Sequence, residues 1–493
     1  MNRHASWLAV ALSACAFFEE PEPDGGTGDT LSFSRSAIFG ATHSDSFISL
    51  AGDDEGAWYV GGTSKELLDS FSSDFTVVKL SATGAIEWAR TWGGEGHDGV
   101  RPHIDSEGEG PARHLAAAPG GGVFVAGLSD SVADFSAAVL LRYAKDGALQ
   151  WARAWKPNWN NQANSEAKLM AVTATDDTVY AVGTTQGEAA WLLQAYALDG
   201  AAKWTVSLDP SAGVNDRPFS VVASGDGLYV GGWMGNGNEG LLLRLDVSTA
   251  PPSVDWAVRV KLPAGSTLPD LDVDAEGNLY AAADIHGVAT YHAVLKLSPT
   301  GSLLWAREYN REVASQVDTT HVVRAYGGGV IVGGRVSYTQ GSDVETDRAL
   351  GDSVFFIVDG AGNLKRDAYY FTGNPGQSGG GTLDRVRGLA VKDHTLLVAG
   401  NIFSERGQYA GTWRTPASRG IAPSFGPADE VLLQSIDVGP VEDLSATAPR
   451  TQGELTGVTS SDVTSAISAS SASDADGAAK STQGFLFWFD GLL

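Results

Sequence analysis

The feature that most constrains the fold is a repeated segment. The stretch "KLSATGAIEWARTWGG" at Lys79–Gly94 returns as "RYAKDGALQWARAW" at Arg142–Trp155 and as "KLSPTGSLLWAREY" at Lys296–Tyr309. Each copy joins an apolar run to a second run that carries Trp-Ala-Arg, through a short turn with one Gly. Gly supplies the positive φ that tight hairpins require. The repeat therefore predicts a fold built from one recurring β unit.

The complete unit contains four predicted strands, of which the first two form one hairpin and the last two another. The first hairpin occurs at Phe47–Thr63, Arg113–Gly127, Leu169–Thr184, Arg217–Gly232, Leu271–Asp284, Thr320–Gly334 and Arg385–Gly400. The second occurs at Phe75–Trp92, Ala137–Trp155, Ala190–Leu208, Gly240–Lys261, Tyr291–Tyr309 and Ser353–Phe371. A four-stranded unit that recurs at regular intervals along the chain is typical of an all-β fold, the β-propeller.

The first hairpin has seven copies, but only six copies of the second hairpin are continuous. The two ends of the chain supply the two strands of the seventh copy. Phe485–Asp490 near the C-terminus reads as a third strand, while "LSFSRSAIFG" near the N-terminus aligns with "IEWARTWGG". We expect Leu31–Phe39 to lie beside Phe485–Phe489 and so complete the last blade. Such a closure leaves no exposed sheet edge at the junction and predicts seven blades.

The repeated Trp is predicted to fill the wedge between neighbouring blades, because a large rigid ring closes a tapering gap. The residues expected in this docking role are Trp88, Trp151, Trp204, Trp256, Trp305 and, by alignment, Phe33. The units resemble bacterial seven-bladed propeller repeats and, in a Gly-x-x-x-Trp element, the tryptophan-docking repeats of quinoprotein dehydrogenases. Those enzymes use a cysteine pair and a calcium-bound cofactor, whereas this chain has one cysteine. The resemblance therefore implies the fold, and no cofactor is expected.

The N-terminus predicts export and lipidation. The chain opens "MNRHASWLAVALSACAFFEE", in which the apolar run is too short to span a bilayer and fits a secretory signal. Leu12-Ser13-Ala14-Cys15 resembles a bacterial lipobox, which implies cleavage before Cys15 and its acylation. The alternative is an ordinary signal with an incidental cysteine. We expect residues 1–15 to be the signal, 16–30 a flexible acidic tether and 31–493 the propeller.

The charge balance limits the partners. The formal net charge is −26, with 33 Lys and Arg against 59 Asp and Glu. Phosphate binding needs clustered cations, so nucleic acid and anionic bilayer surfaces are excluded as direct partners. Membrane contact is expected through the acyl anchor only, and the protein is expected to be a monomer.

Two irregular loops carry the candidate ligand residues. "GHDGVRPHIDSEGEGPARH" contains His97, Asp98, His103, Asp105 and His114, a mixture suited either to a structural divalent cation or to a solvated polar loop. In the second loop, "KPNWNNQANSE", Trp159 stands among amides that would suit a sugar or a peptide.

Residues 405–483 are an insertion that the blade pattern does not explain. The first half has apolar segments that suggest an extra hairpin. From Leu444 the composition becomes rich in Ser, Thr, Ala and Gly, which predicts a loosely ordered, low-complexity segment.

The sequence predicts a non-enzymatic, lipid-anchored interaction or assembly module at the bacterial cell envelope, on the outer membrane facing the periplasm or the cell surface. Envelope proteins or surface glycans are the expected partners, and a propeller lipoprotein of the outer-membrane barrel assembly machinery is a similar case. Propellers also host hydrolases and lyases. The alternatives are therefore a polysaccharide- or ligand-binding surface protein, or an enzyme with its site on the variable-loop face near the axis.

Overall fold

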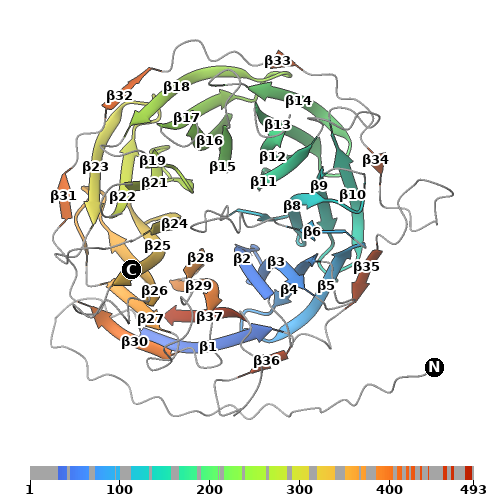
Figure 1. Ribbon diagram of the computed structural model, residues 1–493, viewed down its shortest axis with the longest axis horizontal. Coiled ribbons are helices and arrows are strands. Elements are labelled where there is room, and N and C mark those ends of the chain that lie inside the picture. Colours follow the sequence, from blue (N-terminus) through green and yellow to red (C-terminus); the bar gives the residue numbers. More distant parts are fainter. Residues whose placement is uncertain are drawn as a thin grey trace, which may run out of the picture.

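The computed structural model is all-β in the part of the chain that it describes (Figure 1). It describes residues 32–40, 45–65, 73–94, 96–99, 113–132, 136–156, 166–185, 190–208, 210, 216–235, 239–261, 266–285, 291–309, 319–338, 350–365, 368–372, 385–392, 394–402, 408–413, 418–420, 424–427, 434–435, 442–443, 459–462, 468–470 and 483–490.

Backbone pairing groups the strands into seven antiparallel sheets, numbered here in chain order. The first sheet holds β2 (Asp45–Gly52), β3 (Trp58–Lys65), β4 (Ser73–Leu80) and β5 (Ile86–Gly93). The second holds β6 (Asp98–Gly99), β7 (Leu115–Ala117), β8 (Val123–Ser129), β9 (Ala137–Tyr143) and β10 (Leu149–Trp155). The third holds β11 (Ala167–Ala174), β12 (Thr178–Thr185), β13 (Ala190–Ala197) and β14 (Ala202–Leu208).

The remaining sheets follow the same plan. The fourth holds β15 (Arg217–Ser224), β16 (Gly227–Met234), β17 (Glu239–Asp246) and β18 (Ser253–Lys261). The fifth holds β19 (Ser266–Thr267), β20 (Leu271–Val273), β21 (Leu279–Ile285), β22 (Tyr291–Leu297) and β23 (Leu303–Tyr309). The sixth holds β24 (Thr319–Tyr326), β25 (Gly329–Tyr338), β26 (Leu350–Val358) and β27 (Ala368–Thr372). The seventh holds β28 (Arg385–Lys392), β29 (Thr395–Ile402), β37 (Gln483–Asp490) and β1 (Ser32–Gly40).

The sheets stand around a common centre, with strands such as β2, β11, β15, β24 and β28 innermost (Figure 1). This arrangement confirms the predicted β-propeller. The predicted number of seven blades is not confirmed. Six blades are recognised in the fold, whereas the strand pairing of the described residues gives seven sheets.

The seventh sheet joins the two ends of the chain. β1 pairs antiparallel with β37, with Phe33 opposite Phe489 and Ser36 opposite Phe487, and β37 pairs on its other side with β29. The pairing of the N-terminal strand with the C-terminal strand agrees with the prediction from the sequence. It leaves the sheet without a free edge between the two termini.

In its described residues, the insertion runs around the rim as seven short strands. These are β30 (Gln408–Trp413), β31 (Ser418–Gly420), β32 (Ser424–Pro427), β33 (Gln434–Ser435), β34 (Glu442–Asp443), β35 (Thr459–Asp462) and β36 (Ser468–Ser470). Among the described residues these strands do not pair with one another, so the extra hairpin expected in the first half is not found there. Each pairs instead with the outermost strand of a different sheet, as Figure 1 shows at the periphery.

The apolar core lies between neighbouring sheets. One cluster joins Phe75 and Trp92 of the first sheet to Leu115 and Val125 of the second. Comparable clusters lie at the boundaries of the next sheets in the ring and between the seventh sheet and the first. Each sheet therefore depends on its neighbours for burial, as expected of a repeat architecture.

The closure at β1 can be tested with proline. Successive N–H groups along a strand point to opposite sides, so either Ser36 or Ala37 donates to β37. Proline at that position removes the donor, and we expect the free energy of unfolding to fall by about 1–3 kcal/mol. Ser34 lies at a bulge between Phe33 and Arg35, where proline is tolerated.

Urea unfolding of Ser36→Pro and Ala37→Pro, with Ser34→Pro as the matched control, measures this difference. Equal stability in all three variants would mean that the β1–β37 pairing does not close the ring.

Candidate functional site

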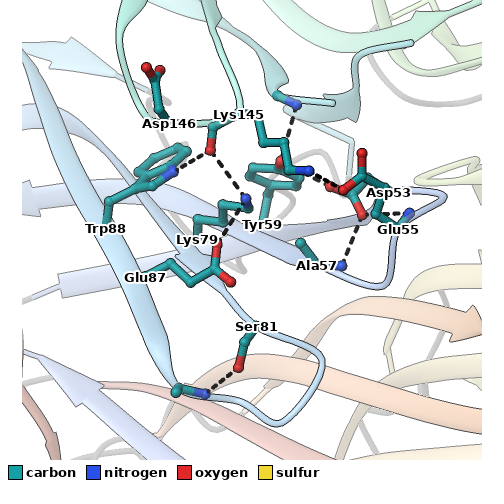
Figure 2. Close-up of polar contacts among 12 residues, drawn as sticks. Asp53, Glu55, Ala57, Tyr59, Lys79, Ser81, Glu87, Trp88, Lys145 and Asp146 are labelled. Carbon is teal, nitrogen blue, oxygen red and sulfur yellow. Dashed lines mark hydrogen bonds and ion pairs between the residues drawn. The ribbon is translucent and has the colours of Figure 1, made fainter. Parts of the chain in front are cut away.

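The repeated Trp-Ala-Arg segment contacts the next sheet along the ring. Trp88 Nε1 donates to the carbonyl of Lys145 at 2.9 Å, and Arg90 Nε donates to the carbonyl of Gly147 at 2.9 Å. Lys145 and Gly147 belong to the turn between β9 and β10. The side chains of one sheet thus bind the peptide groups of the following turn, as Figure 2 shows for Trp88 and Lys145.

Gly at this turn is required by space as well as by conformation. Gly147 has φ of 82°, and a Cβ placed on it would lie 2.9 Å from Trp88 Cδ2. The turn glycine and the tryptophan of the preceding sheet therefore form one docking contact, which we call the Trp–turn contact.

The Trp–turn contact recurs around the ring. Trp Nε1 donates to a turn carbonyl in the next sheet in three further pairs, at 2.9–3.0 Å: Trp151 to Leu198, Trp256 to Pro299 and Trp305 to Gly360. Trp204 is buried against Tyr180, with ring centroids 6.0 Å apart. The side chain of Phe33 lies outside the described residues.

A buried cation lies opposite the tryptophan on the neighbouring strand. Tyr59, Lys79 and Trp88 are cross-strand neighbours on β3, β4 and β5. Lys79 is 2% exposed, its Nζ lies 5.8 Å from the Tyr59 ring centroid, and it donates to the carbonyl of Lys145 at 3.1 Å. Glu87 balances the ammonium at 2.9 Å (Figure 2).

The same row of aromatic, cation and tryptophan occurs in three other sheets. The members are Phe124, Arg142 and Trp151; Tyr229, Arg244 and Trp256; and Tyr280, Lys296 and Trp305. Each cation lies within 6 Å of its aromatic ring, a distance at which cation–π attraction operates. Sequence reasoning missed this row, although a Lys or Arg inside each apolar run before the turn was a usable signal.

Tyr59 also ties the first sheet to the second. Its hydroxyl donates to Asp53 Oδ2 at 3.1 Å and accepts from the Gly122 N–H at 3.1 Å. Burial is the main cause that raises the pKa of Tyr59, so the phenol stays neutral. Asp53 Oδ1 is satisfied by the N–H groups of Glu55 and Ala57 (Figure 2). These hydrogen bonds fix the position of the second sheet against the first, and they occupy the Tyr59 hydroxyl and both oxygens of the Asp53 carboxylate.

A second polar cluster, the axial cluster, involves residues on or beside the innermost strands of several sheets. Asp270 is fully buried beside β20. Its carboxylate accepts from Arg113 Nε at 2.7 Å, Ser220 Oγ at 2.8 Å, the Val323 N–H at 2.9 Å and Arg324 Nη1 at 3.1 Å. One carboxylate therefore connects residues of the second, fourth, fifth and sixth sheets.

Asp272 extends the axial cluster. It lies 3.2 Å from Arg113 Nη2 and accepts from the Ala325 N–H at 2.9 Å. The charges of Asp270 and Asp272 raise the pKa of Arg113 against the effect of burial, which is the largest influence and acts in the opposite direction. Burial lowers the pKa of Arg324, and the neighbouring Arg113 lowers it further.

Two buried histidines complete the axial cluster. His114 Nδ1 lies 3.1 Å from the carbonyl of Ala126 and so donates to it, while Nε2 has no hydrogen-bond partner among the described residues. Burial lowers the pKa of His114 to about 3, and the charge of Arg387 acts in the same direction. His321 Nδ1 lies 3.4 Å from Arg387 Nη1, which donates to it.

The described part of the axial cluster contains charges of both signs. Its described charged members are Arg113, Arg324 and Arg387 against Asp270 and Asp272, in a chain of net charge −26. Sequence reasoning did not find this cluster, because its members are separated by up to 274 residues in the chain.

The structure places the predicted loop residues in different environments. Asp98 is buried, and its Oδ2 accepts from the Gly94 N–H at 2.7 Å and from Ser131 Oγ at 2.6 Å, while burial raises its pKa. His97 is exposed, and His114 belongs to the axial cluster. His103, Asp105, Trp159 and Cys15 lie outside the described residues. Within the described part, no group of three His, Cys, Asp or Glu is arranged to hold a metal ion.

Comparisons with known proteins give no family. No protein-family description and no curated protein matches the chain. Among solved structures, a candidate 6-phosphogluconolactonase from Bacteroides uniformis is 14% identical, with a TM-score of 0.43 over 76% of this chain and 100% of that one. A europium-containing methanol dehydrogenase is 14% identical, with a TM-score of 0.38 over 74% and 85%. A puromycin hydrolase is 12% identical, with a TM-score of 0.39 over 75% and 54%. Similarity at this level carries no argument about activity.

The Trp–turn contact can be tested with two glycines of similar φ. Gly147→Ala adds a methyl group against Trp88, whereas Gly120 has φ of 76° and open space around its Cβ position. Both substitutions incur the cost of a left-handed alanine. We expect Gly147→Ala to lower the free energy of unfolding by about 1–3 kcal/mol more than Gly120→Ala, because of the additional overpacking. Equal losses in urea unfolding would contradict the contact.

The axial histidine predicts acid sensitivity. The folded pKa of His114 is lowered from 6.5, so its contribution to stability is complete above pH 6.5 and is lost as pH falls toward 3. Between pH 7 and pH 5 this group alone should cost about 2 kcal/mol of the free energy of unfolding.

His114→Asn keeps a donor near Nδ1 and removes the titration, so its stability should change less over that interval. His97→Asn, at an exposed position, is the control and should retain the wild-type pH dependence. Parallel pH profiles for all three proteins would show that His114 titrates normally.

Proposed function

We propose that this protein is a lipid-anchored, seven-bladed propeller that acts as a protein-interaction or assembly module at the bacterial cell envelope. The observation that carries the proposal is how the buried charges are used. Asp270 accepts four hydrogen bonds from four directions, and Lys79 and Arg113 are ion-paired within the ring. These groups hold sheets together, which is the chemistry of a rigid scaffold.

The blade count in this proposal is supported by the strand pairing. Seven sheets are recorded, and the seventh combines β28 and β29 with the two terminal strands β37 and β1. An all-antiparallel ring that is completed by both chain ends needs no further strand to close.

The membrane anchor in this proposal rests on the sequence around Cys15. Acyl chains on that cysteine would hold the protein at a membrane, and residues 16–30 would act as the tether. The described residues contain no helix of the length and apolarity needed to cross a bilayer.

A second candidate function is the binding of a small anion at the axis. The observation that favours it is that three arginines, Arg113, Arg324 and Arg387, gather at the axial cluster. Guanidinium groups bind anions through their fixed set of N–H donors. This candidate matches the alternative of a ligand-binding or enzymatic site near the propeller axis.

The proposal is tested by recovering the intact protein from gently solubilised membranes. We expect stoichiometric co-purification of the same envelope proteins in repeated preparations, and their loss with Cys15→Ala. A reporter protein fused to residues 1–30 is the matched control, since it is anchored in the same way without the propeller.

Proteins that also co-purify with the reporter would be bound through the membrane anchor and not through the propeller. A clean monomer that carries a stoichiometric anion or metal ion would contradict the assembly role and favour the axial site. Enrichment of surface polysaccharide without protein would identify a glycan-binding protein instead.

A further inference from the structure

The insertion forms a belt, defined here as the strands β30 to β36, that follows the rim in the direction opposite to the chain. β30 pairs with β27 of the sixth sheet, β31 with β23 of the fifth, β32 with β18 of the fourth and β33 with β14 of the third. β34 then pairs with β10 of the second sheet, β35 with β5 of the first and β36 with β1 of the seventh. The belt therefore visits every sheet once (Figure 1).

The belt starts and ends at one place. It leaves the chain after β29 and returns at β37, and these two strands are antiparallel neighbours in which Ile402 lies opposite Gln483. A two-residue turn could join that pair directly. The inserted residues are therefore not needed to connect the strands of the seventh sheet.

Each belt strand occupies the outer edge of a sheet. Without the belt, the outermost strands β5, β10, β14, β18, β23, β27 and β1 would each present a row of unpaired N–H and C=O groups. Such edges take up extended segments of other chains. Seven of them on one ring would make self-association through the rim favourable.

The belt ladders are individually short. They contain between two and five pairs of opposed residues, as in Val206–Ser435 and Ser207–Gln434 for β33. Backbone pairing of this length holds weakly on its own, and the seven ladders act together because they are linked in one chain. The belt is thus suited to covering edges without building a core.

We propose that the belt is an edge guard, which prevents the rim of the propeller from pairing with a second copy of the same chain. A second copy is the occupant because it presents identical edges, so that each exposed outer strand meets a matching strand. The fifth sheet adds an apolar contact, since Leu304 on β23 is 52% exposed. This inference is independent of the lipid anchor and of any envelope partner.

The test replaces residues 403–482 with Asn-Gly in the Cys15→Ala chain and measures mass by light scattering over a range of concentrations. The chain with its belt is expected to remain a monomer. The belt-free chain should at least double its weight-average mass as concentration rises. Leu304→Lys in the belt-free chain should reduce that association, because an edge lysine opposes strand pairing.

Addition of the belt in trans is the rescue experiment. A peptide of residues 403–482 should return the belt-free chain to a monomer. The matched control peptide carries proline at two adjacent positions in each of two strands, Gly411 and Thr412 in β30 and Ser460 and Ser461 in β35. Successive N–H groups point to opposite sides, so one proline of each pair removes a donor to the propeller, and this peptide should rescue at least fivefold less well at equal concentration.

A belt-free chain that does not fold is replaced by a chain with protease sites after Ile402 and before Gln483, which is cut after folding. Association of the propeller once the belt has been washed away would support the proposal. A folded propeller that has lost its belt by either route and stays monomeric at all concentrations would overturn it.

Discussion

The contact on which the ring depends is the bond between a tryptophan indole and the turn of the next sheet. Trp88, Trp151, Trp256 and Trp305 each donate to a main-chain carbonyl across a sheet boundary. The accepting group is backbone, so the contact requires only that the turn be tight. This explains why the chain repeats a short Gly-containing turn together with a tryptophan: the two are halves of one contact that lie in successive repeats.

On the strand next to each of these tryptophans, a Lys or Arg lies in register with the indole and packs against an aromatic ring of the preceding strand. The cation is buried at Lys79 and Lys296, where it interacts with a ring and with a nearby carboxylate. Burying a charge without partners is costly, and these partners recover that cost. At the centre, Asp270 plays a comparable role for Arg113 and Arg324. The ring is therefore held by polar contacts in two places, at the Trp–turn contacts between sheets and at the axial cluster. The apolar core lies between the sheets.

The parts of this structure that could be predicted are those that use side chains periodically. The Trp-Ala-Arg repeat and the alternating apolar strands predict the propeller, and the alignment of Phe33 with Trp88 predicts the pairing of β1 with β37. The axial cluster could not be predicted, because Arg113 and Asp270 meet only once the ring has closed. The belt was missed for another reason: its strands pair through the backbone, and backbone pairing leaves no pattern in a Ser- and Ala-rich segment.

Closure of the ring by its two ends is the claim that a single crosslink tests most directly. Ser36 and Phe487 lie opposite each other on β1 and β37, at a separation that a disulfide can span. In the Cys15→Ala background, Ser36→Cys with Phe487→Cys should oxidise spontaneously and make the chain covalently circular, which changes its mobility on a non-reducing gel. The account predicts nearly complete crosslinking in the folded protein and little after unfolding in urea. Failure of the folded chain to crosslink, or equal crosslinking in urea, would contradict a propeller whose last sheet is shared by both termini.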